Sequence, residues 1–217
     1  MEYEIDKVWY ACYGSNIQEK RFLCYIQGGT PAGALTNYKG CTDTAAPKEN
    51  HPITINRDLY FAKESPAWSG GGIGFLKPGH NEEAVTLGRQ YLIGSDQFTD
   101  LVKQELKMEG ELAIEFGELI EKGSVICSPG GRYGKLICLG HRDEKPIFSF
   151  TSEHYLEDEI NPPDKAYLST IISGLKEIYD LDNQELVEYF RSKTGIKNTP
   201  MESSLAEIVE NVSSKRL

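Results

Sequence analysis

Apolar residues fall in short runs along the first two-thirds of the chain, and glycine- and proline-rich turns separate these runs. Runs of this length and spacing predict strands. They cover residues 8–12, 53–61, 72–75, 84–93, 125–127, 135–139 and 147–150. Helical periodicity interrupts them at about 17–27 and about 96–108. The pattern predicts an α+β fold, in which a small mixed, mostly antiparallel sheet curls into a β-barrel with flanking helices.

The pattern changes after Asn161-Pro162-Pro163, where apolar residues recur at helical spacing. Three segments show it, around 167–179, 186–196 and 205–212. We therefore predict a β-rich core over residues 1–160. A helical C-terminal extension over residues 161–217 is expected to pack on that core.

The composition of the chain bears on whether it binds nucleic acid or membranes and on its cellular compartment. The chain has 217 residues and a net charge of −10, without a basic block that could hold phosphates, so we expect no nucleic-acid partner. No apolar run reaches the length of a membrane span, and the acidic N-terminus does not resemble a signal peptide. The five cysteines show no Cys-x-x-Cys spacing. We expect reduced thiols and a cytoplasmic protein with no membrane partner, while the oligomeric state is left unknown.

The loop Tyr13-Gly14-Ser15-Asn16 follows the apolar run of residues 8–12 and precedes a helical pattern. Asn16 is a candidate N-cap, with Glu19 placed three residues later as in a capping box. A glycine at a helix start lets backbone N–H groups approach a carboxylate or a carbonyl oxygen. The alternative is an ordinary turn, because Gly-Ser-Asn is common turn chemistry.

Glu105 interrupts an apolar helix stripe. Phe98, Leu101 and Val102 mark one face, and the next position on it is Glu105. Burial raises the pKa of a carboxyl group, which suits a residue that accepts and then donates a proton. The alternatives are that Glu105 is solvated on a rotated helix, or that it pairs with a buried Lys or Arg. Glu109, beside Gly110, is the rival candidate.

Other catalytic signatures are missing from the sequence. The four histidines lack the spacing of zinc ligands, so a metal hydrolase or a zinc deacetylase is poorly supported. Neither a P-loop nor a Gly-x-Ser-x-Gly nucleophile motif occurs. Cys12 has no basic neighbour in the sequence, and we interpret it as a packing residue.

Residues Tyr10-Ala-Cys-Tyr-Gly-Ser-Asn16 resemble the signature of the gamma-glutamylcyclotransferase-like family, in which an apolar strand enters a Tyr-Gly-Ser-Asn loop. Arg21 stands where that family has an arginine in the next helix, and Glu105 stands at the position of its catalytic glutamate. Tyr167, after Pro162-Pro163, resembles its C-terminal helix. The segment 106–111 lacks the tyrosine-containing pattern of the family, which leaves the substrate identity open.

The resemblance implies that a small γ-glutamyl amine or peptide is cyclised to 5-oxoproline with release of the amine. It implies that Tyr13, Gly14, Ser15, Asn16 and Tyr167 bind the substrate and that Glu105 transfers the proton. It also implies that no metal or cofactor is needed. Two alternatives stay open: a non-catalytic small-acid binding module on the same fold, and a different transferase or amide-forming reaction in the same pocket.

Overall fold

The computed structural model describes residues 5–31 and 37–214, so the first four residues of the acidic N-terminus lie outside it. Contacts group the chain into two interleaved compact units. Unit 1 takes residues 1–12, 20–53 and 89–154, and unit 2 takes residues 13–19, 54–88 and 155–217. The boundary expected at residue 160 stays a prediction.

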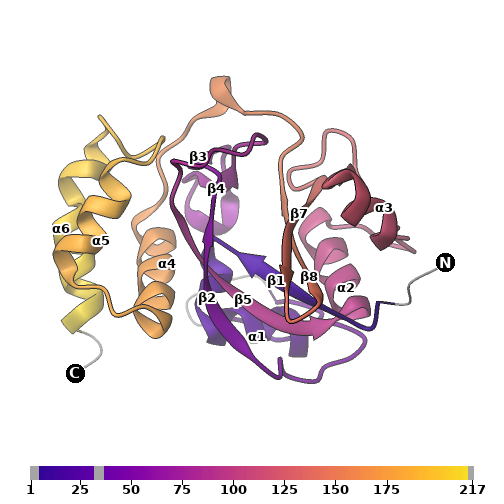
Figure 1. Ribbon diagram of the computed structural model, residues 1–217. Helices are drawn as coiled ribbons and strands as arrows, with labels where there is room; N and C mark the ends of the chain where they lie inside the picture. The colour runs from indigo at the N-terminus through magenta and orange to yellow at the C-terminus, as the bar shows by residue number, and fades with distance from the viewer. Residues whose placement is uncertain (1–4, 32–36, 215–217) are drawn as a thin grey trace. The chain divides into compact units, whose positions relative to one another are not determined.

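A mixed sheet is the centre of unit 1 (Figure 1). Its strand order is β2 (Asn50–Ile55), β5 (Thr86–Gly94), β1 (Lys7–Cys12), β8 (Lys145–Thr151), β7 (Lys135–Arg142) and β6 (Ser124–Ile126). Strand β1 runs antiparallel to β5 and parallel to β8, and β7 runs antiparallel to both β6 and β8. The α+β class and the mixed sheet are confirmed. Within the described residues, however, the sheet is open between β2 and β6 and does not close into a barrel.

Aromatic side chains hold the helices of unit 1 against the sheet. Tyr10 of β1 packs against Phe22 of α1 (Glu19–Gln27) and Phe98 of α2 (Ser95–Leu106), with ring centroids 5.5 and 6.1 Å away. Phe116 of α3 (Phe116–Lys122) stacks on Phe148 of β8 at 5.5 Å. The sequence did not predict α3, because a helix of seven residues is too short to show a helical period.

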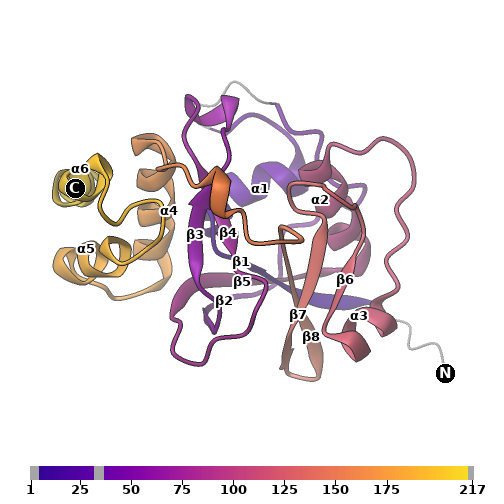
Figure 2. The same ribbon diagram turned by 90° about the horizontal axis from the view of Figure 1, so that it is seen from above.

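Unit 2 combines a two-stranded antiparallel sheet with three long helices. The strands are β3 (Leu59–Ala62) and β4 (Ile73–Leu76). The helices, grouped together in Figure 2, are α4 (Lys165–Ile178), α5 (Asn183–Arg191) and α6 (Pro200–Ser214). Three 3₁₀ turns complete the unit: η1 (Ser15–Ile17), η2 (Pro66–Trp68) and η3 (Glu157–Glu159). The three helices predicted after residue 163 are therefore confirmed. In the described part of the chain, no helix is both long and apolar enough to cross a bilayer.

The single strand predicted over 53–61 is two strands, because a turn at Asn56-Arg57-Asp58 divides it. The carbonyl oxygens of this turn accept hydrogen bonds that are not part of the main-chain pairing between strands. Asn81 N–H donates to Asn56 O at 2.9 Å, and Thr86 Oγ1 donates to Arg57 O at 2.6 Å. These bonds satisfy backbone groups that a continuous strand would have paired in the sheet.

Helix α4 packs directly on η1 in unit 2, and Gly174 makes this packing possible. A Cβ at Gly174 would lie 2.4 Å from the backbone N of Gln18 and 2.5 Å from the carbonyl carbon of Ile17. Those distances are shorter than any real contact, so the helix reaches the turn only because residue 174 has no side chain.

Gly174→Ala should lower the free energy of unfolding by about 1–3 kcal/mol, because the added methyl group overpacks the α4–η1 contact. Urea unfolding measures this loss. Gly79→Ala is the matched control in the same unit, because nothing lies within 4 Å of its added Cβ. Equal effects of the two substitutions would contradict the packing argument.

Candidate active site

The Tyr13–Asn16 loop belongs to unit 2 and leads into η1. Tyr13 and Asn16 are buried, while Gly14 and Ser15 are half-buried. Ile17 N–H donates to Gly14 O at 3.0 Å, and Gln18 N–H donates to Ser15 O at 3.2 Å. The loop is therefore a tight turn that the backbone itself holds.

Two details of the predicted helix start are wrong. Asn16 does not cap a helix, because it lies inside η1, whose N-cap is Gly14. Helix α1 begins at Glu19, and Glu19 N–H donates instead to the Glu177 carboxylate of α4 at 3.1 Å. A carboxylate from a distant part of the chain thus takes the place of the expected local cap.

Tyr167 and the loop are brought together in unit 2. The Tyr167 hydroxyl accepts a hydrogen bond from Gly74 N–H at 3.0 Å, and its ring packs against Trp68 at 5.0 Å. A Cβ at Gly14 would lie 2.9 Å from Tyr167 Oη. Because the φ angle of Gly14 is −112°, close approach of Tyr167, and not a left-handed backbone, is what requires glycine there.

Glu105 belongs to unit 1 and lies in the last turn of α2, after the buried residues Phe98, Leu101 and Val102. The residue as a whole is half-buried, but burial of its carboxyl group raises its pKa above the ordinary value. A hydrogen bond from Tyr25 and the charges of Arg21 and Arg132 oppose this rise without cancelling it. Glu105 thus has the partners that its predicted burial requires.

Tyr25 of α1 donates the hydrogen bond to Glu105. Tyr25 is buried, and its pKa is raised well above its ordinary value, first by burial and then by the charge of Glu105. The phenol therefore keeps its proton and remains a donor. Gln104, next to Glu105, donates from Nε2 to the Tyr25 carbonyl oxygen at 2.9 Å, so side-chain and main-chain contacts join α1 to α2 here.

Arg21 belongs to the same cluster, because its charge acts on Glu105. Its Nη2 donates to Tyr38 Oη at 2.9 Å, and the Tyr38 ring contacts the Tyr25 ring with centroids 4.1 Å apart. Arg21 is only 6% exposed. A buried guanidinium, two phenols and a carboxyl group thus form one polar network inside unit 1.

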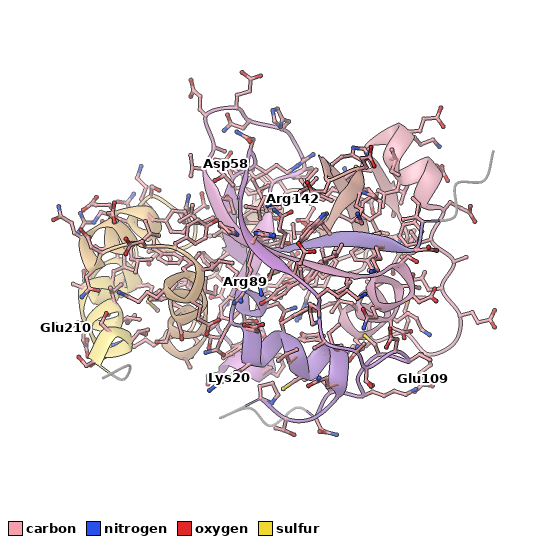
Figure 3. The ribbon with its side chains drawn as sticks, turned by 60° about the horizontal axis from the view of Figure 1, so that its bottom comes forward. Lys20, Asp58, Arg89, Glu109, Arg142 and Glu210 are labelled. Carbon is pink, nitrogen blue, oxygen red and sulfur yellow. The ribbon has the colours of Figure 1, made fainter. Side chains whose placement is uncertain are left out.

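The other candidate catalytic residues in unit 1, Glu109 and Cys12, are less suited to proton transfer or nucleophilic attack. Glu109 is exposed (Figure 3). Cys12 is buried, its thiol contacts Arg89 O at 3.2 Å, and burial raises its pKa to about 12, so it remains a neutral thiol. All five cysteines are free. In the described residues, no group of three or more His, Cys, Asp or Glu side chains is arranged to hold a metal ion.

The site residues predicted from sequence therefore fall into two sets. Unit 2 holds Tyr13–Asn16 with Tyr167 beside Gly14. Unit 1 holds Glu105 with partners that sequence reasoning did not assign to it, Tyr25 and Arg132. No spacing rule connects residues 25, 105 and 132, so only the folded chain reveals this second set.

Comparison with solved structures finds a "Gamma-glutamyl cyclotransferase", 14% identical, with a TM-score of 0.49, covering 95% of this chain and 99% of that one. A second is a yeast cyclotransferase described as specific to glutathione, 12% identical, with a TM-score of 0.35, covering 95% and 97%. Gamma-glutamyl cyclotransferases are thus among the solved structures to which this chain is similar.

No protein-family model matches the chain. It is 36% identical over 197 residues to "Histone deacetylase 5" of Arabidopsis thaliana. That match covers 84% of this chain and 30% of the relative. The chain therefore spans about 30% of the length of the curated relative that it matches.

The contact between Gly14 and Tyr167 can be tested by a double-mutant cycle on the free energy of unfolding. Gly14→Ala should destabilise the wild-type protein, because the new methyl group meets the Tyr167 hydroxyl. In a Tyr167→Phe background its cost should be about 1 kcal/mol smaller, since the nearest remaining ring atom is 4.0 Å away. Equal costs in both backgrounds would show that the hydroxyl does not limit residue 14.

Tyr25→Phe should raise the pKa of Glu105 further, because it removes a hydrogen bond that favours the ionised carboxylate. Titration of the carboxyl ¹³C signal of Glu105 by NMR measures this shift. Tyr189→Phe is the control, since Tyr189 is another tyrosine with a hydrogen-bonded hydroxyl, which accepts from Leu87 N–H at 3.0 Å. An unchanged titration in Tyr25→Phe would remove Tyr25 as the partner of Glu105.

Proposed function

We propose that this chain cyclises the γ-glutamyl group of a small γ-glutamyl amine or peptide to 5-oxoproline and releases the amine. The free α-amine of the substrate attacks its own γ-carbonyl carbon. A new C–N bond closes the five-membered ring, and the original amide C–N bond breaks. Because both reacting groups belong to one molecule, the protein needs chiefly to hold a folded substrate and to carry protons from the attacking nitrogen to the leaving nitrogen.

The raised pKa of Glu105 is the observation that carries this proposal. The substrate amine is an ammonium group at neutral pH and cannot attack until it loses a proton. A carboxylate whose pKa lies above its ordinary value is a stronger base, and its protonated form can then protonate the leaving nitrogen. The carboxylate form is lost as pH falls through this raised pKa, so turnover should fall on the acid side.

The Tyr13–Asn16 loop is proposed to hold the carbonyl end of the substrate. Backbone N–H groups of a tight glycine-containing turn suit the negative charge that develops on the carbonyl oxygen. Tyr167, which approaches Gly14 in the same unit, is proposed to bind the substrate beside this loop.

A non-catalytic module that binds a small acid is the second candidate. It is favoured by the match to only 30% of a longer protein that is named for a different activity. In such a module the loop and the arginine side chains bind the acid, and Glu105 transfers no proton. Turnover separates the two candidates, because a binding module releases no 5-oxoproline.

Glu105→Gln should lower the turnover of γ-glutamyl substrates by about 10²–10⁴-fold, the usual contribution of a general acid–base group. The neutral amide keeps the size of the side chain, so the fold is expected to survive. Release of 5-oxoproline from a panel of γ-glutamyl amines and peptides is the measurement.

Glu109→Gln is the matched control, since Glu109 is exposed four residues further on. It should leave turnover near the wild-type value. Full activity in Glu105→Gln, or an equal loss in both variants, would contradict the proposed role of Glu105.

A further inference from the structure

Trp68 of unit 2 is a large aromatic residue outside both the Tyr13–Asn16 loop and the Glu105 cluster. The chain has two tryptophans, and the other, Trp9, is 1% exposed in the core of unit 1. Trp68 is half-buried, so part of its side chain reaches the surface of unit 2. A tryptophan in this position presents a rigid apolar surface to a ligand at a low cost in conformational entropy.

The loop that carries Trp68 is closed by its own main chain. Trp68 is the last residue of η2, and its N–H donates to Ser65 O at 2.9 Å. Gly71 N–H donates to Trp68 O at 2.8 Å, and Ser65 N–H donates to Gly71 O at 3.1 Å. The main-chain groups of Trp68 are thus paired within the loop, which gives its side chain a fixed base.

The same loop is held against the start of α4, the helix that carries Tyr167. Gly72 N–H donates to Pro162 O at 2.8 Å. A Cβ at Gly71 would lie 2.4 Å from Asp164 N, and Asp164 is the N-cap of α4. This approach is closer than a residue with a side chain permits, so glycine at this position lets the loop and α4 pack directly.

Tyr167 contacts both Trp68 and the Tyr13–Asn16 loop. The Trp68 and Tyr167 rings pack with their centroids 5.0 Å apart. A Cβ at Gly14 would lie 2.9 Å from the Tyr167 hydroxyl oxygen, which accepts a hydrogen bond from Gly74 N–H at 3.0 Å. Trp68, Tyr167 and Gly14 are therefore consecutive members of one series of contacts within unit 2.

We propose that the Trp68 ring is the apolar wall of the substrate site and packs against the methylene groups of the γ-glutamyl chain. This inference rests on the proposed function, in which the Tyr13–Asn16 loop holds the carbonyl end of the substrate. The chain must fold back for the amine to reach the γ-carbonyl carbon, and a flat rigid surface beside it favours that conformer. Small-molecule sites commonly combine a few polar groups with such an aromatic lining.

Protection of Trp68 from a collisional quencher tests this contact. In Trp9→Phe, Trp68 is the remaining tryptophan, and acrylamide should quench its fluorescence because its side chain reaches the surface. Saturating 5-oxoproline, the product of the proposed reaction, should cover the ring and lower the quenching constant. In Trp68→Phe, which retains the buried Trp9, 5-oxoproline should leave the quenching constant unchanged.

The affinity for 5-oxoproline gives an independent measure of the same contact. In isothermal titration calorimetry on the full chain, Trp68→Ala should weaken binding by about 3- to 10-fold, the effect of losing one aromatic packing contact. Trp68→Phe keeps a ring and should bind with an affinity between that of Trp68→Ala and the wild type. It also provides the comparison if Trp68→Ala does not fold. Trp9→Phe is the control and should retain the wild-type affinity.

Unchanged quenching of Trp68 at saturating 5-oxoproline overturns the proposal. Wild-type affinity in Trp68→Ala, or in Trp68→Phe where the alanine variant does not fold, also overturns it, as does a wild-type protein that does not bind 5-oxoproline. The turnover assay separates these failures from failure of the proposed function. Release of 5-oxoproline without any dependence on Trp68 leaves the enzyme and removes the apolar wall. Trp68-dependent binding without turnover supports the apolar wall and removes the enzyme.

Discussion

Burial of the Glu105 carboxyl group is the constraint on which the rest of unit 1 depends. Burial favours the protonated form and raises the pKa, while Tyr25, Arg21 and Arg132 favour the ionised form. Because burial has the larger effect, the group is a better base than an exposed glutamate and remains able to ionise. A lone buried carboxylate would be too costly to retain, and a fully paired one would be too weak a base.

Several hydrogen bonds join α1 and α2 around Glu105. Gln104 of α2 binds the main chain of Tyr25, and the side chain of Tyr25 binds Glu105 on α2. The Cys41 thiol, close to both Tyr25 O (3.4 Å) and Gln97 O (3.6 Å), adds a further link. Glu105, the proposed proton-transfer group, is thus positioned by contacts between two helices and not by a mobile loop, which suits chemistry that needs a fixed geometry.

The features that depend on local sequence pattern could be predicted from the sequence. The apolar run of β1, the helical periods and the place of Glu105 on an apolar stripe all follow from spacing. The predictions were wrong where the local structure depends on residues that are distant in the sequence. Glu177, not Asn16, satisfies the start of α1, hydrogen bonds divide the predicted 53–61 strand, and the open sheet depends on pairing between strands. Tyr25 and Arg132 were not assigned to Glu105, because the hydrogen bond of Tyr25 and the charge effect of Arg132 on Glu105 arise only in the folded chain.

The role of Glu105 as the base is tested most directly by the pH dependence of single-turnover 5-oxoproline formation, measured together with the titration of Glu105 in the same protein. We predict that the rate falls on the acid side with the pKa that Glu105 itself shows, above the ordinary value for a glutamate. A rate that does not follow the titration of Glu105, or a Glu105 pKa at its ordinary value, would contradict the claim that this buried carboxylate is the base.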